Sequence, residues 1–376
     1  MEKRILLSSP TMHTEELQFV QEAFDKNWIA PLGFNCDNFE TELAAFVSQG
    51  IGDAFHGLSL CSGTAALHLA VKLAGVKPGD VVLCSDMTFC ATVNPVTYEG
   101  GRQVFIDSEA ESWNMDPVAL EKAFEKYPEA KVVLLAHLYG VPSKMDEILE
   151  ICRRHNAILI EDAAEALSAV YHGRQCGTFG DYNAVSFNGN KIITTSGGGM
   201  LLTRTKEARD KAFFWATQAR EPAPWYQHEE IGYNYRLSNI SAGIGRGQMK
   251  VLPLRIRQKQ AIHARYRENL KDLPLALQDQ RPDTVNNCWL SVMLLAPGCS
   301  VTPAQVLQAL GEANMEGRPL WKPMHSQPVF ANAPYVTAGE GSVSEDLFNR
   351  GVCLPSDTKM TMADVDRVCD VIRRLF

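Results

Sequence analysis

Residues 185–200 read Val-Ser-Phe-Asn-Gly-Asn-Lys-Ile-Ile-Thr-Thr-Ser-Gly-Gly-Gly-Met, and the other motifs of the chain are best understood around this stretch. An apolar run ends in Asn188-Gly189-Asn190, which is typical of a tight turn. Lys191 follows at once and precedes a β-branched run and three glycines. A lysine held between a turn and buried chain is partly desolvated, and this favours the neutral amine that attacks a carbonyl group. The alternative is an ordinary turn lysine that points at water.

The composition is that of an ordinary soluble globular protein. The chain has 376 residues, 45% of them hydrophobic and 21% charged, and a net charge of −8. No basic block indicates nucleic-acid binding, and no basic amphipathic helix indicates a membrane surface. The apolar stretch near the N-terminus is far too short for the hydrophobic region of a signal sequence. No window of the sequence approaches a membrane span. Ten cysteines are scattered without a C-x-x-C pair, so we expect neither a zinc site nor disulfides, and we expect a cytoplasmic protein.

The length predicts two domains, a large one over residues 1–250 that carries the site and a small C-terminal α+β one over residues 251–376. Short apolar runs alternate with helical patterns, which predicts an α/β fold with a mostly parallel sheet covered by helices on both faces. We expect a long basic helix over residues 255–271 to join the domains. Strands are expected at residues 57–61, 81–84, 103–106, 132–137, 157–161, 200–203 and 288–295, and other helices at 14–26, 38–47, 65–74, 91–98, 117–126, 145–156, from 206, 303–313 and 362–375.

Chemistry-bearing residues follow several predicted strands, at the edge where such sheets bind ligands. Ser62-Gly63-Thr64 lies at a helix N-terminus, where it forms either an anion site or a plain cap. Asp162 is either a site carboxylate or a cap for the next helix. Phe89 stands shortly after another strand and belongs either to the site or to the core. Ser186 adds a hydroxyl beside the Lys191 turn.

Taken together, these residues are the parts that a pyridoxal phosphate enzyme needs. They comprise an anion cradle, an aromatic ring, a carboxylate for the pyridine nitrogen and a lysine for the aldehyde. The chain has no G-x-G-x-x-G after its first strand and no P-loop, which argues against a dehydrogenase and against a P-loop nucleotide-binding enzyme. We expect no metal.

From about Leu7 to the C-terminus, the chain resembles the DegT/DnrJ/EryC1/StrS family of nucleotide-sugar aminotransferases, which have the type I aminotransferase fold. The motifs that carry the resemblance are Trp28-Ile29-Ala30-Pro31-Leu32-Gly33, Ser62-Gly63-Thr64-Ala65-Ala66-Leu67, Ile160-Glu161-Asp162-Ala163-Ala164-Glu165-Ala166, Gly177-Thr178-Phe179-Gly180, Ser186 to Met200, and Gly232-Tyr233-Asn234-Tyr235-Arg236-Leu237-Ser238-Asn239.

The resemblance implies pyridoxal 5′-phosphate as cofactor and a homodimer with shared active sites. It implies that Lys191 binds the cofactor covalently, that Asp162 contacts the pyridine nitrogen and that Phe89 covers the ring. The implied phosphate contacts are Gly63, Thr64, Ser186 and, from the neighbouring subunit, Asn234.

Glu165 departs from the commonest family pattern, because many relatives carry Gln there, near the ring hydroxyl of the cofactor. A carboxylate beside that oxygen would repel it, so either Glu165 is protonated or the hydroxyl keeps its proton. Glu165 and the Asn188 to Met200 run are most similar to the PglE-type enzymes that aminate UDP-4-keto-6-deoxy-N-acetylglucosamine in bacillosamine synthesis.

Four residues are candidates for substrate contacts. Trp28 belongs to a loop expected to read the nucleotide, together with residues 321–330. His325 is either a residue of the sugar-nucleotide site or an ordinary loop histidine. Arg220 and Arg236 either pair with a diphosphate or a donor carboxylate, which Arg binds bidentately, or form surface salt bridges.

The expected reaction is a ping-pong transamination from L-glutamate, with Lys191 shuttling the proton. GDP-perosamine synthases and dTDP-sugar aminotransferases share most of these motifs and are the alternative substrate classes. Relatives that perform sugar 3-dehydration carry His at the position of Lys191, so the lysine argues against that chemistry. A non-catalytic regulator on the same fold is the alternative outside enzymes.

Overall fold

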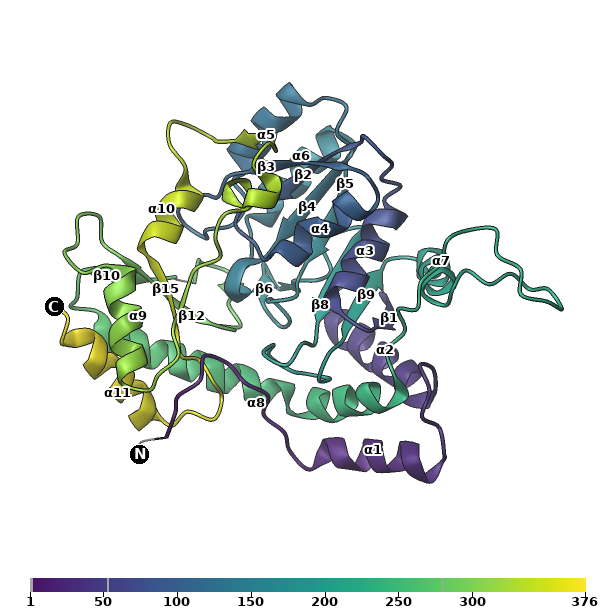
Figure 1. The fold of residues 1–376 in the computed structure, drawn as a ribbon, viewed down its shortest axis with the longest axis horizontal. Helices are drawn as coiled ribbons and strands as arrows, with labels where there is room; N and C mark the ends of the chain where they lie inside the picture. Colours follow the sequence, from purple (N-terminus) through teal and green to yellow (C-terminus); the bar gives the residue numbers. More distant parts are fainter. Residues whose placement is uncertain (1–2, 53, 279) are drawn as a thin grey trace.

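An eight-stranded sheet forms the centre of the molecule in the computed structural model, which describes residues 3–52, 54–278 and 280–376 (Figure 1). Its strand order is β1-β9-β8-β5-β4-β2-β3-β14, and β9 runs antiparallel to both of its neighbours, whereas the other pairings are parallel. The bounds are β1 (His56–Leu60), β2 (Val81–Ser85), β3 (Arg102–Ile106), β4 (Val132–Ala136), β5 (Ile158–Asp162), β8 (Tyr182–Ser186), β9 (Gly199–Thr203) and β14 (Tyr335–Val336).

Helices cover both faces of this sheet, as its apolar strands predict. Alternate strand residues point to opposite faces, so Val82 and Cys84 pack in one core cluster with α3 (Gly63–Leu73) and α4 (Cys90–Tyr98). Val81 and Leu83 pack in another, with α5 (Pro117–Lys126) and α6 (Met145–Arg154). The remaining helices of this part are α1 (Glu15–Asp25), α2 (Phe34–Val47) and α7 (Lys206–Ala216).

A second core lies around the C-terminal residues. The four-stranded sheet β10-β12-β15-β13 packs there against the end of α8 (Asn239–Leu270) and against Ile5 from the N-terminus. The other elements of this part are β10 (Leu275–Leu277), β12 (Ser291–Leu295), α9 (Pro303–Glu312), β13 (Arg318–Pro319), α10 (Val343–Arg350), β15 (Gly351–Leu354) and α11 (Met362–Arg373). The predicted division at residue 250 falls inside α8, and it stays a prediction.

Helix α8 differs most from the prediction, because it begins at Asn239 and not at Arg255, and it continues through Pro253. Glycines in its first half lower helix propensity, so the sequence pattern did not predict a helix there. They are needed for close packing, since a Cβ at Gly245 would lie 2.7 Å from the Phe39 ring and one at Gly247 2.6 Å from the Glu16 backbone. Helix α8 therefore packs closely on α1 and α2.

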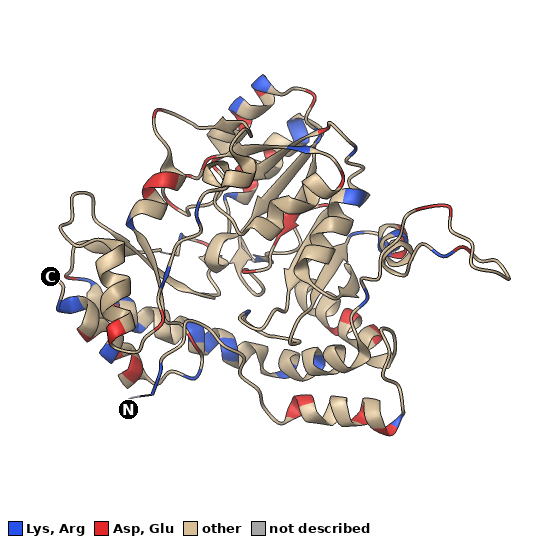
Figure 2. Ribbon diagram, in the orientation of Figure 1, with Lys and Arg blue, Asp and Glu red and all other residues tan. Residues whose placement is uncertain are grey.

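Smaller elements complete the fold. A three-stranded sheet has the order β11-β6-β7, formed by β6 (Val170–Tyr171), β7 (Arg174–Gln175) and β11 (Thr284–Val285). Short 3-10 helices lie at Leu138–Gly140, Met324–Ser326 and Pro328–Phe330. Charged residues gather on the outer helices and loops, whereas the central strands carry few apart from the acidic end of β5 (Figure 2). No described helix combines the length and the apolar character needed to cross a bilayer.

Candidate active site

A cavity of about 360 Å³ opens at the carboxyl ends of the central strands, where the fold class predicts a ligand site. Among its lining residues are the ends of β1, β4, β5 and β8 and the start of α3. Trp289 and Trp321, from the C-terminal part of the chain, close it from the other side. The predicted site residues that line it are Gly63, Thr64, Phe89, Asp162, Glu165, Ser186 and Lys191. The structure thus brings these seven together, while the role of each stays a prediction.

The N-terminus of α3 forms one wall. Ser62 is the helix cap, because its Oγ accepts the Ala65 N–H at 3.0 Å. The amides of Gly63 and Thr64 have no acceptor within the helix, and they carry the positive end of its dipole. A Cβ at Gly63 would lie 3.0 Å from the Ser186 Cβ, so the Ser186 hydroxyl stands beside these amides. This wall is suited to an anion.

Asp162, at the end of β5, is only 7% exposed and faces the same cavity. One carboxylate oxygen accepts the Ala164 N–H at 2.9 Å, and the other accepts the Thr92 hydroxyl at 2.7 Å. No helix follows Asp162 over the described residues 163–169, so it is not a helix cap; it closes the turn over residues 164–168 and lines the cavity. Burial raises the pKa of this carboxyl group, while its hydrogen bonds and the Lys191 charge act in the opposite direction.

Lys191 points into the cavity and not at bulk water. Its N–H donates to the Asn188 carbonyl at 3.0 Å, which closes the predicted turn. Its side chain is 12% exposed, and its Nζ lies 4.0 Å from the centre of the Trp289 ring. Residues 192–195 are buried as expected, but they form no strand.

Glu165 is the nearest acidic partner of Lys191, with 3.6 Å between Oε1 and Nζ. Oε2 accepts the Tyr139 N–H at 2.7 Å, and Oε1 accepts the Trp321 Nε1–H at 3.3 Å. Burial raises the pKa of the Glu165 carboxyl group, although the Lys191 charge and the Tyr139 N–H oppose this rise.

Phe89 belongs to the cavity and not to the core, since it is 49% exposed in the single chain. Its ring lies 5.2 Å from that of Trp321, tilted by 50°. The two rings form an aromatic wall on which a flat heterocycle can stack.

Two of the substrate candidates are already paired with acidic residues inside this chain. Arg236 is buried, and its Nη1 pairs with Glu40 Oε1 at 2.6 Å and donates to the Ser59 carbonyl at 3.0 Å, so it is held inside the protein. His325 is held by Asp86, with its Nδ1 2.8 Å from the carboxylate, and it stacks on Tyr335. Neither residue lines the cavity of this chain, and their roles in substrate binding stay predictions.

Three other candidates lie on the surface of the single chain. Trp28 is 45% exposed, and its Nε1–H donates to the Leu32 carbonyl at 2.8 Å. The Arg220 guanidinium lies over the Tyr226 ring, and Asn234 is exposed. None of the three lines the cavity of this chain, and their roles stay predictions.

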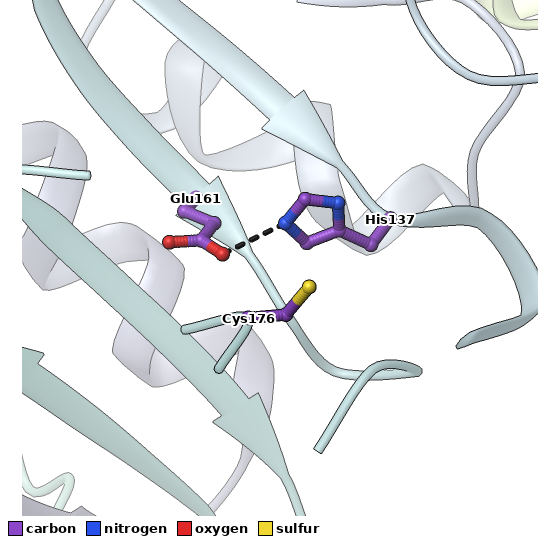
Figure 3. Close-up of side chains that lie close together, drawn as sticks. All are labelled: His137, Glu161 and Cys176. Carbon is purple, nitrogen blue, oxygen red and sulfur yellow. Dashed lines mark hydrogen bonds and ion pairs between the residues drawn. The ribbon is translucent and has the colours of Figure 1, made fainter. Parts of the chain in front are cut away.

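His137, Glu161 and Cys176 form a buried cluster behind the cavity, in which the potential ligand atoms lie within 4.8 Å of one another (Figure 3). His137 Nδ1 accepts the Ser143 N–H at 3.0 Å, so the ring carries its proton on Nε2 and donates it to Glu161 at 2.7 Å. Backbone N–H groups of residues 177–180 also donate to the Glu161 oxygens. Burial raises the pKa of the Cys176 thiol. Hydrogen bonds thus satisfy His137 and Glu161, which link the ends of β4 and β5 beside Asp162.

Sequence reasoning missed several lining residues. Trp289 carried no signal, because it reaches the cavity from a different part of the chain. Thr92 lies within a helix and is identified only by its bond to Asp162. His137 had a usable signal, since it directly follows the apolar strand Val132–Ala136 at the ligand-binding edge.

The arrangement fits pyridoxal phosphate. The start of α3 with the Ser186 hydroxyl suits the phosphate, the aromatic wall suits the ring, and Asp162 and Lys191 suit the pyridine nitrogen and the aldehyde. The start of α3 is held firmly from behind, since Gly199 packs so closely on it that a Cβ there would lie 2.5 Å from the Gly63 nitrogen.

Comparison with known proteins agrees with this chemistry. The profile of the DegT/DnrJ/EryC1/StrS aminotransferase family matches residues 10–373. EpsN of Bacillus subtilis, which is named as a pyridoxal phosphate-dependent aminotransferase, is 48% identical over 100% of this chain and 97% of its own length. A GDP-perosamine synthase of Caulobacter vibrioides is 34% identical over 97% of this chain and 96% of its own. The aminotransferase TlmJ of Streptoalloteichus hindustanus superposes with a TM-score of 0.88 at 26% identity, over 98% of each chain. The chain therefore belongs to the DegT/DnrJ/EryC1/StrS family and is a pyridoxal phosphate-dependent aminotransferase.

Proposed function

We propose that this enzyme transfers an amino group from L-glutamate to C4 of a nucleotide-linked 4-keto-6-deoxy sugar, specifically UDP-4-keto-6-deoxy-N-acetylglucosamine, with Lys191 as the covalent anchor of the cofactor. The observation that carries the proposal is the position of the Lys191 amine in one cavity with Asp162 and the N-terminus of α3. A regulator would not need this arrangement.

Bound pyridoxal phosphate supplies an electron sink that stabilises negative charge on the substrate carbon that exchanges its proton. In the proposal, Asp162 keeps the pyridine nitrogen protonated, with one of its oxygens fixed by Thr92. Once the donor has displaced it, the free Lys191 amine would move the proton between the substrate carbon and the cofactor carbon. Gly63, Thr64 and Ser186 bind the phosphate.

Glu165 acts in this proposal as a protonated acid that donates a hydrogen bond to the ring oxygen of the cofactor. Burial raises the pKa of its carboxyl group, which supports this protonation state. The Tyr139 N–H and the Trp321 Nε1–H fix the two carboxyl oxygens, so the side chain has one orientation toward Lys191.

A homodimer completes the site in this proposal. Lys191 is the one Lys or Arg among the residues that line the described cavity, yet the ligands include the cofactor phosphate and a nucleotide diphosphate. We assign the missing contacts to Asn234 and Arg220 of a second copy. Asn234 is exposed in the single chain, and in the same segment Trp225 and Tyr226 are 65% and 78% exposed. Such aromatic exposure is costly in a monomer.

The choice of sugar rests on Glu165 and on the runs 188–200 and 234–239, which resemble the bacillosamine-type enzymes. The named GDP-perosamine synthases, 30–34% identical over nearly the whole chain, make GDP-4-keto-6-deoxymannose the principal competing acceptor. A dTDP-linked 4-keto sugar is the other alternative, because one relative is named as a dTDP-sugar 4-aminotransferase.

Comparison of kcat/KM for the UDP-, GDP- and dTDP-linked 4-keto sugars, with product NMR, tests the acceptor. We expect the UDP-N-acetyl sugar to be preferred and its N-acetyl group to be retained. A preference of about tenfold or more, equivalent to ~1.4 kcal/mol, for another sugar overturns the substrate assignment but leaves the transaminase chemistry intact.

Borohydride reduction of the holoenzyme followed by peptide mapping tests the anchor. The reduced cofactor should be found on Lys191. A label on any other lysine would show that the assignment is wrong.

A further inference from the structure

Lys259, on α8, is a buried lysine that the proposed chemistry does not use. It is 2% exposed, and a lysine is rarely buried so completely without a specific role for its charge. Burial lowers the pKa of Lys259 to about 7, while the Asp357 charge opposes the decrease and Arg255 adds to it. An apolar residue of similar length would avoid this desolvation cost.

The Lys259 ammonium group has three N–H donors and three acceptors. Its Nζ donates to the Ser356 carbonyl at 2.6 Å, to the Trp289 carbonyl at 2.9 Å and to the Ser8 Oγ at 3.1 Å. These acceptors belong to three segments that are far apart in the sequence. Lys259 therefore ties the N-terminal segment and two C-terminal segments to the middle of α8.

Two of the residues that accept from Lys259 also donate hydrogen bonds to the turn that carries Lys191. Ser8 Oγ donates to the Asn190 carbonyl at 2.9 Å, and Trp289 Nε1–H donates to the same carbonyl at 2.7 Å. The Trp289 ring also lies 4.0 Å from the Lys191 Nζ. Lys259 is thus linked through one intermediate residue to the peptide before Lys191 and to the ring beside its amine.

The space between the two lysines is nearly closed. Lys191, Ser8 and Lys259 line one crevice of about 10 Å³, and a cavity of this size holds at most about one water molecule. There is thus little room for water beside these direct hydrogen bonds.

We propose that Lys259 is a positioning residue for Lys191, because its ammonium group fixes, through Ser8 and Trp289, the turn that carries the Lys191 amine and the ring that the amine contacts. This inference rests on the proposed role of Lys191 as the cofactor anchor. An error of about 1 Å in the position of such a group can cost about a hundredfold in rate.

Lys259→Met in the holoenzyme tests the proposal, since it matches the Lys stem out to Cε and removes the ammonium group with all three donors. Lys250→Met, an exposed lysine of the same helix, is the matched control. The first measurement is the pH titration of the visible absorbance of the bound cofactor, which reports the environment of the nitrogen supplied by the anchoring lysine. The second is kcat with KM for the sugar nucleotide.

Lys259→Met should shift the titration midpoint by about half a pH unit or more. It should lower kcat by about tenfold to a hundredfold, with KM changed much less. Ser8→Ala, which breaks one of the two links, should shift the midpoint less, and it should add little to Lys259→Met in the double variant. Lys250→Met should leave both quantities unchanged.

An unchanged midpoint and kcat in Lys259→Met overturn the proposal. If Lys259→Met fails to fold, Ser8→Ala and Trp289→Phe decide, because each removes one donor to the Asn190 carbonyl, and an unshifted midpoint in both overturns it. Borohydride mapping of the wild-type protein separates this failure from the failure of the proposed function. A label away from Lys191 refutes the anchor, whereas a label on Lys191 with no effect of Lys259 refutes only the positioning role.

Discussion

Asp162 shows how one carboxylate combines a structural and a site position. From the sequence, a cap and a site carboxylate were alternatives. In the described chain no helix follows; one oxygen accepts the Ala164 N–H and closes a turn, and the other accepts the Thr92 hydroxyl at the wall of the cavity. The two tasks use different oxygens, so a substitution can retain the first and remove the second.

Asp162→Asn should therefore fold normally and lose activity. The Asn side chain can also accept the N–H two residues on and close the same turn, so we expect a nearly unchanged melting temperature. An amide carries no negative charge for the pyridine nitrogen, so kcat should fall by at least about a hundredfold, the scale seen when one preorganised electrostatic partner is removed. Asp116→Asn is the control, because Asp116 caps α5 with a 2.7 Å bond to Val118 and lies away from the cavity. Near-normal turnover in Asp162→Asn would leave closing the turn as the only role.

At the scale of elements, the sequence pattern predicted most strands and helices to within a few residues, and the reasons for the failures are physical. Apolar runs of the central strands are unambiguous, because both faces of this sheet are covered. Helix α8 was predicted to begin sixteen residues too late, at 255 and not at 239, since Gly243, Gly245 and Gly247 weaken the helical pattern while they allow close packing. The buried pairing of Arg236 could not be predicted, because its partner Glu40 is 196 residues away and no local pattern joins the two.

The residues nearest the chemistry were predictable where the chain itself brings them together. Asp162, Ser186 and Lys191 each lie at or just beyond the end of a recognisable strand. Trp289 reaches the same cavity through tertiary packing, which periodicity does not encode. A sequence pattern therefore identified the half of the cavity built by the large sheet more fully than the half built by the C-terminal residues.

Glu40 connects several elements, and its lowered pKa predicts how the stability of the protein depends on pH. It accepts hydrogen bonds from the Ser59 N–H of β1, from Arg236 and from Arg209 of α7. Burial raises the pKa of Glu40, but these partners outweigh it and hold the pKa below its usual value. At a pH between the lowered native pKa of Glu40 and its unfolded pKa of about 4.3, the unfolded chain binds more protons than the native one. The stabilisation is therefore complete above about pH 4.3 and is lost as the pH falls below that value.

Glu40→Gln should remove this part of the acid dependence. We expect the variant to be less stable at neutral pH, because Arg236 remains buried without its charged partner. The free energy of unfolding, measured by urea titration from pH 6 down to 3, should then fall less steeply than in the wild type. Parallel curves for the two proteins would show that Glu40 titrates alike in the native and unfolded states.

At the scale of the whole molecule, the described chain does not account for all the charge its ligands require. The cavity holds the carboxyl groups of Asp162 and Glu165 and a single lysine, while exposed Asn234 and Arg220 lie outside it. In the proposed homodimer, a second copy related by a twofold axis would supply both residues, and the same operation would complete the second site. A shared site predicts that two inactive variants complement each other, whereas a subunit with a complete site of its own predicts no such recovery.

Lys191→Ala and Asn234→Ala proteins, each of low activity alone, should recover activity when their subunits are exchanged. In a mixed dimer, one site combines Lys191 from the second variant with Asn234 from the first, whereas the other site lacks both. Random exchange makes about half of the dimers mixed, so about a quarter of the wild-type sites should be restored. Lys191→Ala mixed with Asp162→Asn is the control, because both residues belong to the same subunit's cavity and no mixed dimer contains an intact site. Mass spectrometry should verify exchange in both mixtures. Verified exchange without recovery in the first mixture would mean that Asn234 does not act across the interface, and equal recovery in both would show that the gain does not come from shared sites.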